Sequence, residues 1–231
     1  MKMMSFNTQH CKNYITGEID FEIMANAIKS CGADVVGLNE MRGEGPHPDF
    51  TAQTERLSEL TGMKYFYFAP ALHLKKGLYG NAILSKYPIE RAENIPIPDP
   101  DVKKYDGYYE TRCVLKATLA GGITVLVTHF GLNPDEQENA VCTVLAHTVR
   151  EKCILMGDFN ARPGDPVLVP IREEMKDTAD FFEKELFSYP SDAPTHKIDY
   201  IFVSPDVKVV AADIPAIVAS DHRQHTAEIE I

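Results

Sequence analysis

Apolar positions along the chain alternate between two spacings, which predicts that helices and strands alternate. Segment 20–30 repeats its apolar side chains every three or four residues, the period of a helix with one buried face. Segment 33–40 is an almost unbroken apolar run, which favours a buried strand. Segment 50–60 returns to the helical spacing and is closed by Gly62. The first part of the chain therefore predicts an α/β fold.

Strand patterns dominate the rest of the chain. A helix is expected from its cap at Asn133 to about Glu151, because Pro134 occupies the first turn and Glu136 follows three residues after the cap. The mixture indicates one sheet packed on another with helices outside. Strands are predicted over residues 1–10, 63–72, 80–86, 111–130 (two strands joined at a glycine pair), 152–159, 196–204, 207–214 and 225–231.

Nothing in the composition divides the chain. No linker, repeat or low-complexity tract is visible in the 231 residues, so we expect a single domain that spans 1–231. The long loop predicted over 94–110 is rich in Pro, Asp and Tyr, a composition that disfavours core packing. Long loops of this kind often carry function.

The net charge of −11 has the wrong sign for a protein that grips nucleic acid by broad neutralisation of phosphates. It is compatible with a site for divalent cations that then faces an anionic substrate. A nuclease is not excluded by this charge, because a bound metal ion changes the local charge.

Cysteine usage and hydropathy argue against an exported or membrane-embedded chain. The five cysteines are odd in number, irregularly spaced and without a CxxC pair, which argues against a disulfide framework or a zinc site. No apolar run approaches the roughly 20 residues of a membrane helix, and the N-terminus lacks the apolar segment of a signal peptide. If residue 1 is the native start, a cytoplasmic protein is expected.

Residues whose side chains can act in catalysis or bind a metal ion recur where the apolar runs end. In "CILMGDFNARPGD", Asp158 and Asn160 follow such a run, although turn formation alone explains that stretch equally well. The same pattern elsewhere favours a shared site at one edge of the sheets. Several carboxylates that converge on a hard divalent ion would satisfy one another. The other residues of this pattern are Asn7, Glu40, His129, Asp199, Asp221 and His222.

These positions form an ordered set of motifs that resembles the endonuclease/exonuclease/phosphatase superfamily, the metal-dependent phosphoesterases related to DNase I. Each motif alone is weakly specific, but the set occurs in family order over nearly the whole chain. One departure is visible, because Gln224 and His225 follow "SDHR" where relatives commonly have proline. The motifs are SFN at 5–7, NE at 39–40, GNAILSKYPI from 80, ETR at 110–112, TH at 128–129, GDFN at 157–160, IDYIF at 198–202 and SDH at 220–222.

The resemblance implies a four-layer α/β/β/α sandwich, in which helices flank two packed mixed sheets. It also implies hydrolysis of a phosphoester with Mg²⁺ or Mn²⁺, since a hard metal ion stabilises the negative charge that builds on phosphate oxygens during attack by water. A phosphodiesterase is the favoured activity. The alternatives are a nuclease acting on DNA or RNA and, from a different class, a non-catalytic binding module of the same fold.

The resemblance also implies roles for single residues. Glu40 corresponds to the principal metal ligand, with Asn7 and Asp221 on the metal side. Asp158 corresponds to the residue that orients or deprotonates the attacking water, and Asn160 to its neighbour that binds phosphate or water.

The histidines of the motifs correspond to groups that contact phosphate. His222 is expected to take part in proton transfer, with Asp199 fixing its ring, and His129 to contact the phosphate or the leaving group. Either Asp158 or the His222–Asp199 pair can be the general base. The remaining histidines lie outside the motifs and are expected on the surface or in the core: His10, His47, His73, His147, His196 and His225.

The substrate side is less defined. Asn81, Tyr79 and Tyr109 are candidate substrate-binding residues. Arg112 is another, but a structural ion pair with Glu110 is equally compatible with the sequence. Stacking tyrosines and the lysine pairs 75–76 and 103–104 would support a nuclease. The acidic charge and short loops favour a small phosphoester or a lipid headgroup instead. No protein partner is predicted.

Overall fold

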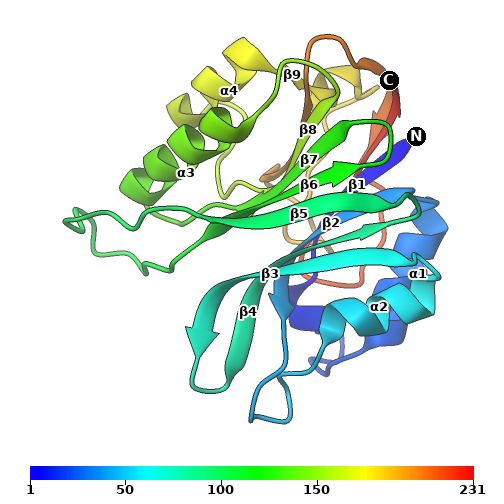
Figure 1. Ribbon diagram of the computed structural model, residues 1–231, viewed down its shortest axis with the longest axis vertical. Helices are drawn as coiled ribbons and strands as arrows, with labels where there is room; N and C mark the ends of the chain where they lie inside the picture. The colour runs from blue at the N-terminus through cyan, green and yellow to red at the C-terminus, as the bar shows by residue number, and fades with distance from the viewer.

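Two six-stranded sheets pack face to face, and helices cover both outer faces (Figure 1). The computed structural model describes all residues from 1 to 231. The helices are α1 (Phe21–Cys31), α2 (Gln53–Thr61), α3 (Pro134–His147) and α4 (Val169–Glu174). The first sheet has the order β11 (Lys208–Asp213), β12 (His225–Glu230), β1 (Lys2–Asn7), β2 (Val35–Arg42), β4 (Gly77–Ser85) and β3 (Tyr65–Leu74). The second has the order β5 (Ile89–Pro96), β6 (Cys113–Leu119), β7 (Ile123–His129), β8 (Cys153–Asp158), β10 (Asp199–Val203) and β9 (Lys176–Asp177).

Three apolar cores separate the four layers. The strands alternate their side chains between the two faces of each sheet, so β1 sends Met3 into the core between the sheets and Met4 toward α1 and α2. On the other sheet, Ile201 of β10 joins the inter-sheet core, whereas Tyr200 packs under α3 and α4. The α/β/β/α sandwich implied by the sequence is confirmed.

Each sheet contains one parallel pair of strands at its centre. Strands β1 and β2 are parallel and joined through α1, and β7 and β8 are parallel and joined through α3. The carboxyl ends of a parallel pair meet at one edge of the sheet, where ligands commonly bind in α/β folds. Both edges lie at the end of the molecule away from the two chain termini (Figure 1).

Several predicted boundaries were wrong. Strand β5 begins at Ile89 and takes in Asn94–Pro96, so the long loop starts after Pro96 rather than at residue 94. Helix α3 ends at His147 instead of about Glu151, because Thr148 is already extended and the following side chains bury little surface. The short helix α4 was not predicted, since six residues carry too little periodicity.

The cysteines form no disulfide. All five are free, and four are buried as small apolar side chains, with Cys142 the exposed exception. No helix combines the length and the apolar composition needed to cross a membrane.

Candidate active site

Strand ends from both sheets deliver polar side chains into one space. Asn7, His129, Asp158 and Asp199 each lie two or four positions from a residue of the inter-sheet core on the same strand. The alternation of side chains therefore points all four between the sheets. The strand register aligns them further, because Asp158 lies opposite both His129 and Asp199.

A β-bulge at the end of β2 turns two successive residues inward. Leu38 lies opposite Ala82 of β4 and Met41 lies opposite Gly80, so Asn39 and Glu40 share a single partner position. Such a bulge breaks the alternation of the strand. Glu40 adopts a positive φ of 60°, a conformation that costs free energy in a residue with a side chain. The result is that Glu40 reaches Asn7 while its neighbour Asn39 also faces the second sheet.

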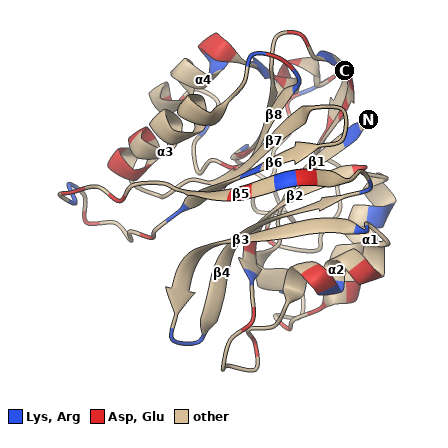
Figure 2. Ribbon diagram, in the orientation of Figure 1, with Lys and Arg blue, Asp and Glu red and all other residues tan.

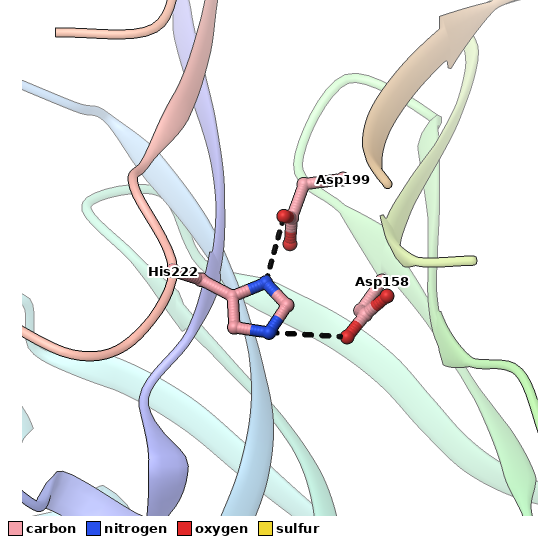
Figure 3. Close-up of side chains that lie close together, drawn as sticks. All are labelled: Asp158, Asp199 and His222. Carbon is pink, nitrogen blue, oxygen red and sulfur yellow. Dashed lines mark hydrogen bonds and ion pairs between the residues drawn. The ribbon is translucent and has the colours of Figure 1, made fainter. Parts of the chain in front are cut away.

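His222 lies between two buried carboxylates (Figure 3). Its Nδ1 atom is 2.8 Å from Oδ2 of Asp199, and its Nε2 atom is 3.6 Å from Oδ2 of Asp158. A carboxylate accepts only, so Nδ1 carries a proton and donates it to Asp199. This bond fixes the ring, with Nε2 directed at Asp158.

The two carboxylates raise the affinity of His222 for a proton. Burial alone would lower the pKa of this imidazole, but Asp199 and Asp158 outweigh burial and raise it to about 10. Burial also raises the pKa of Asp158 to about 7; Asp199 adds to this effect and His222 opposes it. The cluster therefore contains a cationic imidazole beside a carboxyl that titrates near neutral pH.

His129 is a second imidazole close to Asp158, and Arg112 contacts its ring. Its Nε2 atom lies 3.5 Å from Oδ2 of Asp158, and its Nδ1 atom lies 3.0 Å from Nη1 of Arg112. A guanidinium only donates, so Nδ1 accepts and the neutral ring carries its proton on Nε2. Burial and the charge of Arg112 hold the pKa of His129 well below its usual range. Glu110 pairs with Arg112 at 2.6 Å, with both side chains largely buried.

Asn160 lies next to both Asp158 and His129. Its backbone N–H donates to Oδ1 of Asp158 at 2.9 Å, and its Nδ2 donates to the carbonyl oxygen of Phe130 at 3.0 Å and lies 3.2 Å from Nε2 of His129. Asn160 has a φ of 46°. Asparagine tolerates this left-handed conformation better than most residues do. The stretch after β8 therefore forms a turn, and this turn also places Asp158 and Asn160 in the site.

His10 joins the site, contrary to the expectation that it is a surface or core residue. Its Nδ1 atom lies 3.7 Å from Oε2 of Glu40, and its side chain is 24% exposed. The turn that carries it is unusual, because Gln9, His10 and Cys11 all have positive φ values although none is glycine. No glycine marks this turn in the sequence, so the one available signal was that His10 follows Asn7 in the loop at a strand end.

The family comparison covers the residues just described. The model of the Endonuclease/Exonuclease/phosphatase family matches residues 4–222, which include every side chain from Asn7 to His222. The chain belongs to this family.

The chain is also similar to known proteins in sequence and in fold. The uncharacterized protein YbhP of Escherichia coli strain K12 is 27% identical over an alignment of 232 positions, which covers 90% of this chain and 87% of YbhP. An endonuclease/exonuclease/phosphatase from Beutenbergia cavernae superimposes with a TM-score of 0.79 at 23% identity, over all of this chain and 71% of that one. The mannosyl-6-phosphatase Bt3783 of Bacteroides thetaiotaomicron superimposes with a TM-score of 0.77 at 16% identity, over the whole of both chains.

The donor set fits the divalent metal ion that the family implies. The Glu40 side chain is 23% exposed, whereas Asp158 and Asp199 are almost completely buried. Glu40 accepts from Asn7 Nδ2 at 3.0 Å through Oε1, and Oε2 lies too far from His10 for a hydrogen bond. Burial would raise the pKa of Glu40, but the nearby His10 side chain and the hydrogen bond from the Asn7 amide hold it well below its usual range, so the carboxylate is ionised and one oxygen is open to an ion.

Two further residues border this end of the site. Asp221 is partly buried, accepts from Ser220 Oγ at 2.9 Å, and lies close enough to Glu40 for their charges to interact. The Tyr79 phenol has its pKa raised by burial and by Glu40. Both side chains therefore lie within electrostatic range of Glu40.

Asn81 and Tyr109, both predicted to bind substrate, make hydrogen bonds within the protein. The Asn81 carboxamide is buried beneath the site, where it accepts from Asn39 and donates to the carbonyl oxygen of Cys113. The Tyr109 hydroxyl donates to Asp135 at the start of α3. Asn81 joins the two sheets, and Tyr109 anchors the long loop.

Proposed function

We propose that this protein is a metal-dependent phosphoester hydrolase, acting as one domain with Mg²⁺ or Mn²⁺, and that its substrate is a phosphodiester. The observation that carries the proposal is the arrangement of His222, Asp158 and His129 around one space, with Glu40 at its open side. Family membership supports hydrolysis of a phosphoester. A non-catalytic module is disfavoured, because every expected catalytic and metal-side position is filled.

Asp158 is the proposed general base. A carboxyl with a pKa of about 7 exchanges a proton with water effectively near neutral pH. His222 is already protonated in this environment, so it donates from Nε2 to a phosphate oxygen instead of accepting a proton. Asp199 keeps the ring in that orientation through the 2.8 Å bond to Nδ1.

The remaining side chains bind the phosphate. His129 carries a proton on Nε2, and Asn160 carries two on Nδ2, so both can donate to phosphate oxygens. Arg112 sets the tautomer of His129 through Nδ1. Glu40, with Asn7 and Asp221 beside it, would hold Mg²⁺ or Mn²⁺, which supplies positive charge against the oxygens of the phosphate.

The test compares a simple phosphodiester with a simple phosphomonoester. We expect the purified chain with Mg²⁺ or Mn²⁺ to hydrolyse bis-p-nitrophenyl phosphate faster than p-nitrophenyl phosphate, and EDTA to abolish turnover. Asp158→Asn removes the base while keeping the shape of the side chain, so turnover should fall by about 10² or more. The matched control is Asp213→Asn, an exposed position on the edge strand β11. Turnover that survives EDTA or Asp158→Asn would disprove this mechanism.

A nuclease is the second candidate, and one observation favours it. Lys75 and Lys76 occupy the turn of the β3–β4 hairpin, which projects from the body of the molecule, as does the loop that carries Lys103 and Lys104 (Figures 1 and 2). Tyr105 and Tyr108 on that loop are 46% and 68% exposed. Exposed tyrosines with lysines suit a single strand of nucleic acid. Mg²⁺-dependent nicking of supercoiled plasmid, absent in Asp158→Asn, would select this candidate.

A further inference from the structure

A cavity of about 570 Å³ opens beside the start of β10, separate from the catalytic cluster. Its wall comes from the turn after β8, from α4, from the β9–η3 segment and from the residues that lead into β10, where η3 is the short helix Thr178–Phe181. None of Glu40, Asp158, His129 or His222 lines it. The basic side chains of the wall are Arg162, Arg172, Lys184, His196 and Lys197.

Lys197 is the unusual member of this wall. Its side chain is only 5% exposed. Its ammonium group donates to the carbonyl oxygen of Asp199 at 3.2 Å and lies over the ring of Tyr200, and the carboxylate paired with it is 4.0 Å away on Asp177. An ammonium group has three N–H donors, and buried charges are normally paired. No carboxylate therefore lies within hydrogen-bond distance of the Lys197 ammonium group.

The nearby carboxylate is already engaged. Oδ2 of Asp177 accepts from Arg172 at 2.7 Å, and Oδ1 accepts from the backbone N–H of Ala179 at 2.9 Å. One buried carboxylate thus faces two cations, Arg172 and Lys197. This part of the cavity wall, formed by Asp177, Arg172 and Lys197, therefore carries an excess of positive charge, although the net charge of the protein is −11.

Arg162 adds a third cation without a carboxylate. Its guanidinium contacts the imidazole of His196 through Nε2, and the other ring nitrogen of His196 lies 2.6 Å from the Thr195 hydroxyl. The two acids at the mouth, Asp180 and Glu185, are exposed. Solvent screens these acids, as it screens the exposed Arg162 and Arg172, so they offset the charge of the buried Lys197 only weakly.

We propose that this cavity, which we call the basic pocket, binds a phosphate or carboxylate group between Arg162, Arg172 and Lys197. An anion there would supply the missing partner of the buried ammonium group. Arginine is well suited to the role, because its planar fork donates two parallel hydrogen bonds to such groups. The low pKa of Lys197, about 7 because of burial, agrees with a site that lacks its counterion.

The anion can come from a free ion or from a second anionic group on the substrate. A physical connection to the catalytic cluster exists, because His196 forms a β-bridge with Tyr189 and the Tyr189 ring lies 4.9 Å from the ring of His222. Arg162 also follows Asn160 by two residues. The proposal that the cavity binds an anion does not depend on the proposed function. The proposal that the substrate supplies this anion does rest on the proposed function.

The test is titration of the metal-free chain with inorganic phosphate in EDTA, followed by calorimetry. We expect saturable binding that weakens roughly tenfold or more in Arg162→Gln and in Lys197→Met, since each loses a charge-assisted contact. Lys208→Met, at an exposed lysine on β11, should bind phosphate as the wild type does. Absence of saturable binding, or full binding in both pocket variants, would overturn the proposal. If Lys197→Met fails to fold, Arg162→Gln decides alone, because that side chain is exposed.

Kinetics then identify the source of the anion. If the substrate supplies it, Arg162→Gln raises KM for an aryl phosphoester with a second phosphate more than KM for the same ester without one. Equal changes in the two KM values assign the pocket to a free anion, which also supports the proposal. Phosphate binding as expected in a chain without hydrolase activity would disprove the proposed function and leave the basic pocket standing.

Discussion

The backbone N–H of Asp158 donates to Oδ1 of Asn39 at 3.0 Å, across the gap between the two sheets. The Nδ2 atom of Asn39 donates at 2.8 Å to the Thr128 carbonyl oxygen and to Asn81. One buried carboxamide therefore joins the end of β2 to the ends of β7 and β8. It fixes the distance between the metal side of the site, at Glu40, and the proposed base.

Replacing Asn39 should damage both stability and catalysis. Asn39→Ala leaves buried backbone groups and Asn81 without their partner, so we expect a loss of about 2–4 kcal/mol in the free energy of unfolding. Denaturant unfolding measures this loss, and turnover of the folded fraction should also fall. The matched control is Asn94→Ala, an exposed asparagine with one hydrogen bond to the Pro70 carbonyl oxygen. Equal effects of the two substitutions would contradict the bridging role.

Asp199→Asn should lower the pKa of His222. The ring is protonated in the folded chain at a pKa of about 10 because of Asp199 and Asp158, and the substitution removes the first of these charges. Because the pKa is raised on folding, protonation of His222 stabilises the fold fully below about pH 6.5 and this contribution disappears as the pH rises toward 10. NMR titration of the imidazole in the metal-free protein measures the shift. A pKa unchanged by Asp199→Asn would rule out this charge as the cause.

His10→Ala should weaken metal binding, and Mn²⁺ more than Mg²⁺. Two atoms that each lie about 2.1 Å from one ion are roughly 3 to 4 Å apart, which brackets the 3.7 Å between His10 Nδ1 and Glu40 Oε2. Mg²⁺ is bound through oxygen ligands and water, whereas Mn²⁺ belongs to the transition-metal series that also binds nitrogen ligands. Calorimetry with each ion, without substrate, gives the two dissociation constants. His47→Ala is the control, since His47 pairs with Asp49 at the same 3.7 Å in an exposed loop. An equal effect of the two substitutions on metal binding would show that His10 is not a metal ligand.

Lys197→Met should change how stability depends on pH. Burial lowers the pKa of Lys197 to about 7 in the folded chain, although Asp177 and Asp199 act in the opposite direction. Between about pH 7 and pH 10.5 the unfolded chain binds this proton and the folded chain does not, so the wild type gains stability as the pH rises. Lys197→Met lacks this gain. Unfolding at pH 6 and pH 9 in low phosphate tests this, and parallel pH dependence in the two proteins would contradict the burial argument.

The sequence by itself determined the layer architecture and most of the residues that meet in the candidate site. Apolar periodicity placed the central strands, and Asp158, His129 and Asp199 were found because polar residues at the ends of buried strands share one edge of a sheet. The family motifs then gave their roles. These features are local, since a strand of alternating or continuous apolar residues fixes which side of the sheet its last residue faces.

Only the tertiary structure decided the features that break local rules. The bulge at Asn39 and Glu40 depends on pairing with β4, so no alternation within β2 reveals that both residues face inward. The positive φ at His10 occurs without glycine, and its contact with Glu40 joins segments that are 30 residues apart. The sequence puts Asn81 near the start of a strand predicted over 80–86, but in the structure it lies within β4 and packing of the second sheet buries it. Contacts between distant segments set these positions, and a pattern read along one segment contains no information about them.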